Sequence, residues 1–478
     1  MQPFLALFFL ILSSHAQAAT RVLQVRITSV PNTLDWNVAT SGSERAIIQN
    51  IMDGLFSQDV HGVPQKKLAK SYFWSADRKT LNIKLRTDVK WTDGKTIDAS
   101  DFIFSFERLL DPTFNSQNAS LLFDVENARD YFLGKTKSFD AVGIKAPTND
   151  TLQFVLSSPR ASFLSILTHW STFPMRKNHP ELTLGAFRVQ SKTSSEVILQ
   201  STRPNSEISK AIFKVIPKGE DALTEYRKGK VDYLLQLEDS LITSKELNGL
   251  PKPGVVDFIR VVALLHLNPT RLSTNSPEKR RAIMAAIPIQ ALLDAQPLTR
   301  VGAPSIIPST QTGIFSPTGS LDSVSNLGLT LAYPDDALSR SIAEEIQKDS
   351  NRLKIKIEAL PKKDLLSVSK RYDLVLTLFG LDYSDPDQLL SSFLSQGTHD
   401  LFNVSNGDLL KLIQAARSTE DLKAREKLYL DAANLLENQI AIVMPLFYRR
   451  RGFLLRPTFS FDDKRQGTAK LTQIHVKK

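Results

Sequence analysis

The amino-acid sequence predicts an α/β protein that carries an additional β-rich segment. Between residues 327 and 378, apolar stretches with strand periodicity alternate with an amphipathic helical stretch, and such alternation indicates parallel strands joined by crossover helices. Between residues 59 and 159, short alternating stretches and turn residues dominate, with two helical stretches inserted. The chain of 478 residues is long enough for about three domains, and domains can interleave along a sequence.

The composition is that of an ordinary globular protein with a sizeable core. Hydrophobic residues make up 42% of the chain and charged residues 23%. The formal net charge of +10 raises the question of nucleic acid or an anionic membrane surface as a partner. However, Lys and Arg are scattered without interleaved aromatic residues, so we expect no nucleic-acid partner. The longest basic cluster, Arg449-Arg450-Arg451, is predicted to be a solvated strand end.

Residues 1–18 have the features of a secretory signal peptide. The apolar run from Phe4 to Leu12 is too short to span a bilayer, and small residues follow it, so cleavage is expected after Ala18. Because the start of this segment has no Lys or Arg, an uncleaved interfacial anchor remains an alternative. The chain contains no Cys, which excludes disulfides, thiolate metal sites, a thiol nucleophile and a lipid-modified anchor. We therefore expect a periplasmic protein that is not a lipoprotein.

The first strand and helix of the mature chain have clear signals. Residues 21–28 alternate apolar and polar side chains, which predicts a strand. Ser43 is predicted to cap the next helix, whose apolar residues recur at helical spacing up to Leu55. A small polar loop, Thr40-Ser41-Gly42, lies between the two elements.

The best-defined local pattern is a strand, a turn and a capped helix. Residues 80–85 alternate in polarity, which indicates a strand with one buried face. Asp93-Gly94 favours a turn, and Asp98 is placed to cap a helix with an apolar stripe. Asp111-Pro112 ends that helix. We assign Trp91, beside the turn, to the core.

The other elements follow in order. We expect a hairpin over residues 141–156, strands near 184–189, 211–217 and 261–268, and helices at 220–227 and 277–287. In the last third, strands are predicted at 327–333, 353–358, 374–378 and 440–448, with helices at 338–348 and after a cap at 418–421. The stretch 374–378 is apolar throughout, which is typical of a buried strand.

Several of these residues resemble the signature of the family-5 solute-binding proteins of ABC transporters, which are bacterial receptors for oligopeptides, dipeptides and nickel. The resemblance rests on Leu85-Arg86, Trp91, Asp93-Gly94, residues 101–108, residues 31–35 and the segment 382–386. It implies the two-lobed periplasmic binding protein fold (type II, cluster C) with an extra small β-rich domain. The implied division is signal peptide 1–18, lobe I 19–56 plus 160–265 plus 452–478, β-rich domain II 57–159, and lobe II (domain III) 266–451.

A ligand site is expected directly after the buried strand near residue 378. Ligands of open α/β sheets bind outside the carboxyl ends of strands. In the family, the first Asp of a matching Asp-Tyr-x-Asp-Pro motif binds the α-amino group of a peptide, so the resemblance gives this role to Asp382, with Tyr383 beside it. A fixed carboxylate replaces the water that a buried ammonium group loses. From the residues alone, a solvated turn carboxylate is the alternative.

Two backbone segments are expected to flank the peptide from opposite lobes. They are Phe379-Gly380-Leu381 and Thr40-Ser41-Gly42, whose main-chain groups would pair with an extended peptide as in strand addition. Relatives often have Trp near position 379, so Phe379 would keep a smaller aromatic wall. Packing is the alternative role for either segment.

Together these features predict a periplasmic peptide receptor of an ABC importer. We expect a monomer without a cofactor or bound metal that delivers peptides to inner-membrane permease subunits. We expect no enzyme activity, because the sequence lacks a Gly-x-Ser-x-Gly elbow, a phosphate loop and a zinc-protease helix. One alternative is the same fold binding a nickel chelate, an opine or a sugar. Another is a degenerate sensor or chaperone, because Ala286-Ile287-Pro288 departs from the family's Ala-Ile-Asp and the loop after it is shortened.

Overall fold

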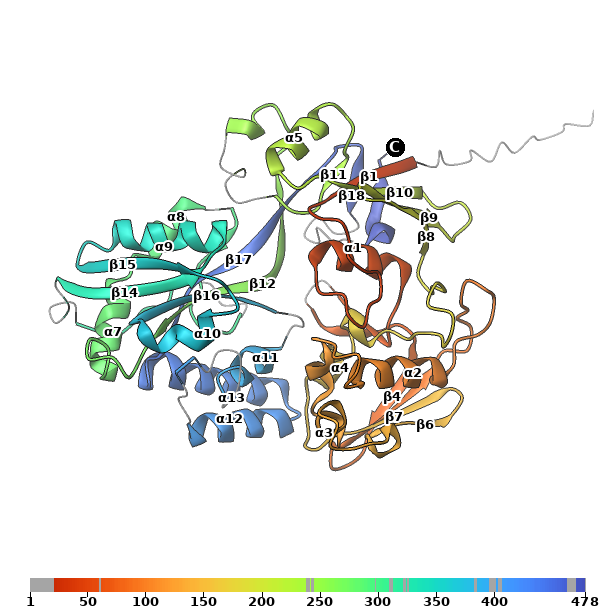
Figure 1. Ribbon diagram of the computed structural model, residues 1–478, viewed down its shortest axis with the longest axis horizontal. Helices are drawn as coiled ribbons and strands as arrows, with labels where there is room; N and C mark the ends of the chain where they lie inside the picture. The colour runs from red at the N-terminus through yellow and green to blue at the C-terminus, as the bar shows by residue number, and fades with distance from the viewer. Residues whose placement is uncertain are drawn as a thin grey trace, which may run out of the picture.

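The computed structural model describes residues 21–59, 62–237, 241, 245–296, 298–308, 313–320, 324, 326–381, 385–394, 401–402, 406–461 and 470–477. It has the predicted α/β fold in two lobes, with a β-rich domain packed below the first lobe in the view of Figure 1. The predicted signal peptide lies outside the described residues.

One large sheet runs through both lobes. Its strands are β1 (Arg21–Ile27), β8 (Phe187–Lys192), β9 (Glu196–Ser201), β10 (Ile208–Val215), β11 (Tyr233–Leu234), β12 (Gly254–Leu267), β13 (Arg300–Val301), β14 (Leu327–Pro334), β15 (Leu353–Leu360), β16 (Leu374–Gly380) and β17 (Val443–Leu455). The order is β15-β14-β16-β12-β17-β11-β1-β10-β9-β8, with β13 paired to β17 off this path. β14 pairs in parallel with β15 and β16, which confirms the crossover pattern predicted for the last third.

Strands β12 and β17 connect the two lobes. They pair with each other in antiparallel orientation, and the register shifts between Val256 and Val261. β12 also pairs with β16 of the second lobe, whereas β17 also pairs with β11 of the first lobe. Both strands run unbroken from one lobe to the other (Figure 1), so they pass through the predicted domain boundaries without a break. The domain bounds given by the sequence therefore stay a prediction.

Helices join the strands of the large sheet. They are α1 (Gly42–Ile51), α5 (Gly219–Arg227), α7 (Pro277–Ala286), α8 (Ile289–Ala295), α9 (Ala337–Asp349), α10 (Leu365–Val368), α11 (Pro386–Ser391), α12 (Gly407–Ser418) and α13 (Leu422–Asn434). The crossover helix α9 buries Ile342 and Ile346 in the same core cluster as Leu331 of β14. This burial of one apolar stripe is what its helical periodicity predicted.

The β-rich domain is built on a smaller sheet of order β4-β5-β7-β6. Its elements are β4 (Ala69–Trp74), β5 (Thr80–Leu85), α2 (Ala99–Leu110), α3 (Ala128–Phe132), β6 (Ile144–Thr148) and β7 (Thr151–Val155), followed by α4 (Phe163–Ile166). Two short pairs, β2 (Phe56–Gln58) with β3 (Pro64–Lys66) and β18 (Phe459–Phe461) with β19 (Ile474–Val476), complete the described strands.

The predicted strand, turn and capped helix of this domain are confirmed. Gly94 has a φ of +87°, which a turn residue with a side chain would adopt only with strain. The Asp98 carboxylate accepts a hydrogen bond from the amide of Ser100 at 2.8 Å and caps α2. Trp91 is buried, and its indole N–H donates to Asp101 at 2.9 Å. Trp91 therefore belongs to the core, as assigned.

Two local predictions are wrong. The cap of α1 is Ser41, not Ser43, because Ser41 and Glu44 form a reciprocal capping box and Ser43 lies buried in the first turn. The cluster Arg449-Arg450-Arg451 is not a solvated strand end. It lies inside β17, which continues to Leu455, and all three side chains are only partly exposed. The pairing of β17 with β12 and β11 extends the strand beyond its apolar part.

A cluster of ion pairs joins the β-rich domain to the second lobe. Arg160 pairs with Asp124 of the β-rich domain and, at 2.7 Å, with Asp387 of α11. Arg417 of α12 pairs with the same Asp387 at 2.8 Å, and its carbonyl accepts a hydrogen bond from the amide of Ala161 at 3.2 Å. The β-rich domain is therefore in direct contact with the second lobe, at a place separate from β12 and β17.

Candidate functional site

The carboxyl end of β16 is the candidate ligand site predicted from the sequence. The ladder between β16 and β12 extends to Gly380, which pairs with Val261, whereas the ladder with β14 covers Leu374 and Val375. Gly380 is exposed, and a Cβ atom built on it would meet no atom within 4 Å. Asp382 and Tyr383, the residues expected to hold the ligand amino group, lie outside the described residues.

The side chains on either side of Gly380 belong to the core. Phe379 and Leu381 are 8% and 7% exposed and pack in one cluster with Val262 and Tyr448. Because these side chains are buried, a ligand at this end of β16 would contact the backbone of Gly380 and occupy the open space beside it. The prediction that Phe379 forms a wall of the ligand site stays untested.

The loop Thr40-Ser41-Gly42 is held by the start of α1. The Glu44 carboxylate accepts hydrogen bonds from the amides of Thr40 and Ser41, both at 2.9 Å, and from the amide of Thr33 at 3.2 Å. Burial alone would raise the pKa of Glu44, but these amides outweigh it and hold the pKa below its usual value. Two amides of the loop are thus already bound within the protein, and Gly42 is the exposed residue at the helix start.

The two predicted segments lie on different halves of the large sheet. Strands β12, β17 and β11 separate β16 from β1, the strand that leads into the loop. At about 4.8 Å between neighbouring strands, this order places β16 and β1 roughly 19 Å apart. A ligand in contact with both segments would therefore touch both lobes.

A buried pair of carboxylates follows the candidate site at the start of α11. Asp385 caps this helix by accepting from the amide of Asp387 at 3.0 Å. Burial, and then the neighbouring charge of Asp387, raise the pKa of Asp385 to about 6. The ion pairs of Asp387 with Arg160 and Arg417 overcome its own burial and hold its pKa below the usual value.

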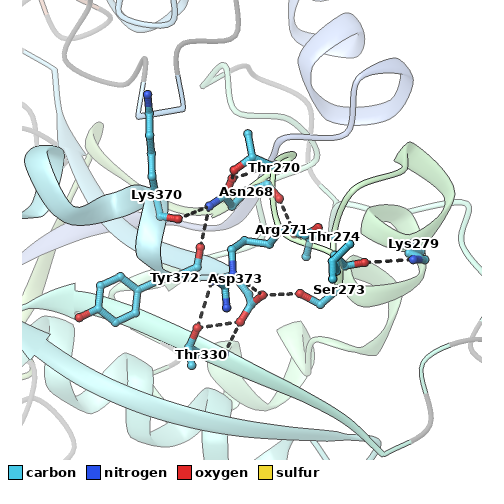
Figure 2. Close-up of polar contacts among 11 residues, drawn as sticks. Asn268, Thr270, Arg271, Ser273, Thr274, Lys279, Thr330, Lys370, Tyr372 and Asp373 are labelled. Carbon is cyan, nitrogen blue, oxygen red and sulfur yellow. Dashed lines mark hydrogen bonds and ion pairs between the residues drawn. The ribbon is translucent and has the colours of Figure 1, made fainter.

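The amino end of β16 holds a polar cluster of a different kind (Figure 2). The buried carboxylate of Asp373 accepts hydrogen bonds from the amide and hydroxyl of Thr330, at 2.9 and 2.7 Å, and from the hydroxyl of Ser273. The side-chain amide of Asn268 donates to the carbonyls of Lys370 and Tyr372. These bonds tie the end of β12 to the starts of β14 and β16, so the cluster is structural.

Within the described ranges, no group of three or more His, Asp or Glu side chains is arranged to hold a metal ion. No helix in the same ranges is long and apolar enough to cross a membrane.

Comparison with known proteins decides the family. The model described as "Bacterial extracellular solute-binding proteins, family 5 Middle" matches residues 63–400, which is most of the chain. The chain belongs to this family.

Curated family-5 relatives cover nearly the whole chain at low identity. The dipeptide-binding protein DppE of Bacillus subtilis is 22% identical over 486 residues, covering 91% of this chain and 89% of its own length. The periplasmic oligopeptide-binding protein OppA of Salmonella typhimurium is 23% identical over 461 residues, covering 87% and 84%. The resemblance seen in the sequence is therefore confirmed.

Solved family-5 structures confirm the fold. The unliganded open form of the periplasmic murein tripeptide-binding protein MppA superposes with a TM-score of 0.80 at 20% identity, covering 96% of this chain and 98% of its own. Haemophilus influenzae OppA in complex with the peptide RPPGFSPFR superposes with a TM-score of 0.73 at 19% identity, covering 96% and 99%. The two-lobed periplasmic binding protein fold is thus shown for this family-5 chain.

One feature of this family-5 chain was missed by the sequence reasoning. Arg26 of β1, Arg45 of α1 and Arg451 of β17 line a single pocket together with Gly42. The three arginines are far apart in the sequence, and Arg26 alternates with apolar neighbours as any strand residue would. No local pattern signals that they meet.

Proposed function

We propose that this family-5 protein is the peptide-binding receptor of a bacterial ABC importer. In this proposal it is a periplasmic monomer that captures peptides between its lobes and passes them to inner-membrane permease subunits, without catalysing a reaction. The curated relatives named above bind dipeptides or oligopeptides. The observation that carries the proposal is the exposed end of β16 at Gly380, two residues before Asp382 in the sequence.

The proposed mechanism is capture by lobe closure. The carboxylate of Asp382 would neutralise the ammonium group of the peptide, and backbone groups near Gly380 and Gly42 would pair with its main chain. Because these contacts come from both lobes, the ligand would bind the closed state of the protein more tightly than the open state. Binding would then increase the population of the closed state. Bending would occur in β12 and β17 near the register shift between Val256 and Val261.

The test is peptide binding by wild type and by Asp382→Asn, measured by calorimetry with trialanine and with N-acetyl-trialanine. We expect wild type to bind the free peptide and to lose about 30-fold or more in affinity when the amino group is acetylated or when residue 382 is Asn, as expected for a desolvated charge pair. Asp408→Asn is the matched control, because Asp408 lies exposed in the second lobe and pairs with Lys411.

Unchanged affinity in Asp382→Asn would overturn the role of Asp382. Native mass spectrometry of the purified protein tests the substrate class separately. A co-purified peptide supports the proposal, whereas a metal chelate or another small solute in its place contradicts it.

A further inference from the structure

The β-rich domain is tied to the first lobe by buried hydrogen bonds. The side-chain amide of Asn37, in the first lobe, donates to the hydroxyl of Ser105 in α2 at 3.1 Å, and both residues are fully buried. Arg108, also in α2, pairs with Asp35 at 2.8 Å and donates to the side-chain carbonyl of Asn37 at 3.0 Å. Separating these groups would leave buried polar atoms without partners, which is costly. We therefore expect the β-rich domain and the first lobe to move as one body.

The second lobe contacts this body through α11 and α12, which lie beside the β-rich domain in Figure 1. The carboxylate of Asp387 on α11 pairs with Arg160 at 2.7 Å and with Arg417 of α12 at 2.8 Å. The amide of Ala161 donates to the carbonyl of Arg417 at 3.2 Å. This carbonyl lies in the last turn of α12, where carbonyl groups have no donor within the helix. The segment that leads out of the β-rich domain therefore satisfies the end of α12.

A second contact lies three residues beyond Arg417. Glu420, between α12 and α13, pairs with Arg78 of the β-rich domain at 3.2 Å. The guanidinium group of Arg78 lies over the ring of Trp74 in β4, 5.5 Å from its centre, and this cation–π contact helps to orient it. The same end of α12 thus meets the β-rich domain in two ion pairs.

The backbone of Arg78 has a conformation that suits glycine. Arg78 lies in the turn between β4 and β5 and has a φ of +59°, which is uncommon for a residue with a side chain. Among the described residues, the other non-glycine residues with positive φ are asparagines and Ala441. A residue held in an unfavourable backbone conformation points to a task for its side chain. For Arg78, that task is the contact with Glu420 in the second lobe.

We propose that the pairs Arg160–Asp387 and Arg78–Glu420 form a latch, which holds the end of α12 on the β-rich domain and keeps the second lobe in the arrangement described here. Without the latch, the second lobe would move away from the β-rich domain more often, while β12 and β17 keep the lobes connected. A contact that is made in one arrangement only raises the population of that arrangement. The inference goes beyond the proposed function, because it concerns the arrangement of the lobes with or without a peptide.

The latch would also matter for binding. The apparent affinity of a ligand falls with the fraction of molecules that are in the binding-competent arrangement. A latch that changes this fraction therefore changes the affinity for any ligand that contacts both lobes, although its own residues need not touch the ligand.

The two contacts of the latch should differ in strength. The side chains of Arg160 and Asp387 are 11% and 0% exposed, whereas those of Arg78 and Glu420 are 35% and 68% exposed. Removing one partner from a buried carboxylate is costly, but an exposed ion pair contributes little and is screened by salt. The Arg160 contact should therefore dominate, and the Arg78 contact should weaken as the ionic strength rises.

The experiment measures the distance between the β-rich domain and the second lobe by double electron–electron resonance without peptide. Because the chain contains no Cys, nitroxide labels on two introduced cysteines report one distance. Lys137→Cys in the β-rich domain and Lys423→Cys on α13 are exposed positions outside the latch. The variants are Arg160→Gln, Glu420→Gln and Arg78→Asn, since asparagine tolerates the left-handed backbone conformation of residue 78.

In the labelled wild type we expect mainly one distance. The ratio of molecules with a longer distance to those with the original one should rise about tenfold or more in Arg160→Gln. In Arg78→Asn and in Glu420→Gln it should rise about twofold to fivefold at low ionic strength. The combination of Arg78→Asn with Glu420→Gln should have no larger effect than either substitution, because the same contact is lost in all three cases.

Arg340→Asn is the matched control. Arg340 is an exposed arginine that pairs with Asp335 at 2.8 Å and lies over the ring of Tyr333, 5.9 Å from its centre, within the second lobe. This substitution should leave the distance unchanged. A second label pair, Lys137→Cys with Lys192→Cys of β8, joins the β-rich domain to the first lobe, and its distance should be the same in every variant.

The outcomes decide for or against the latch. A longer distance in Arg160→Gln alone supports the latch and confines it to the buried contact. An unchanged distance in a folded Arg160→Gln overturns the latch, and so does an equal change in the control label pair, because the β-rich domain has then separated from the first lobe. If Arg160→Gln does not fold, an unchanged distance in Arg78→Asn and Glu420→Gln overturns it. Because no peptide is added, a protein that binds no peptide would overturn the proposed function and leave this result valid.

Discussion

At its amino end, strand β16 starts inside a closed network of hydrogen bonds, whereas at its carboxyl end it stops at an exposed glycine. Asp373 and Asn268 bind hydroxyl groups, amides and carbonyls of three neighbouring segments (Figure 2). Gly380, by contrast, has open space where a side chain would be. The two ends of one strand thus have different tasks: Asp373, directly before its first residue, stabilises the fold, and Gly380, its last residue, leaves room for a ligand.

The strongest test of this contrast is Asp373→Ala. The substitution leaves the partly buried amide and hydroxyl of Thr330 and the partly buried hydroxyl of Ser273 without their acceptor. We expect a loss of about 4 kcal/mol in the free energy of unfolding, because each unsatisfied buried group costs about 1–3 kcal/mol. Urea denaturation measures the loss. Peptide affinity of the folded variant should stay within twofold of wild type, and a large loss of affinity would contradict the separation of tasks.

The second test uses the pH dependence of the carboxyl end. The pKa of Asp385 is raised to about 6 in the folded protein, so the folded state binds more protons than the unfolded state between about pH 4 and pH 6. This residue therefore makes stability fall as pH rises through that range. Asp385→Asn keeps a helix cap but has no charge, and it should gain up to about 3 kcal/mol relative to wild type between pH 4 and pH 7. Urea denaturation at several pH values measures this gain. If the difference in the free energy of unfolding between Asp385→Asn and wild type is the same from pH 4 to pH 7, the raised pKa of Asp385 is contradicted.

The smallest expected effect on stability comes from Gly380→Val. Because a Cβ atom fits there without a contact, stability should change by no more than about 0.5 kcal/mol. Peptide affinity should fall about tenfold, because the new side chain fills the space over the end of β16. Gly328→Val is the matched control: Gly328 is also an exposed strand glycine with no atom within 4 Å of its Cβ position, but it lies near the amino end of β14. Equal losses of peptide affinity in both variants would contradict a ligand site at Gly380.

Elements with strong local signals could be predicted from the sequence. The cap at Asp98, the turn at Gly94 and the crossover helix α9 follow from residue type and periodicity. The cap at Ser41 was missed although its signal is present, because Ser41-Gly42-Ser43-Glu44 is a capping-box sequence and the nearer serine was chosen. This error concerns the candidate site, because Ser41 belongs to the loop Thr40-Ser41-Gly42 that is predicted to contact the ligand.

Features that depend on distant pairing could not be predicted. The apolar run of β17 ends at Tyr448, but the strand continues through three arginines because β12 and β11 supply its hydrogen-bond partners. For the same reason, the pocket of Arg26, Arg45 and Arg451 has no sequence signal. Only the fold brings those side chains to one place.

Arg160 pairs with Asp124 of the β-rich domain and with Asp387 of α11, so a motion that separates this domain from the second lobe has to break an ion pair. The side chain of Asp387 is fully buried, and removing one cationic partner from a buried carboxylate is costly. A motion that keeps this contact intact therefore needs less free energy than one that breaks it.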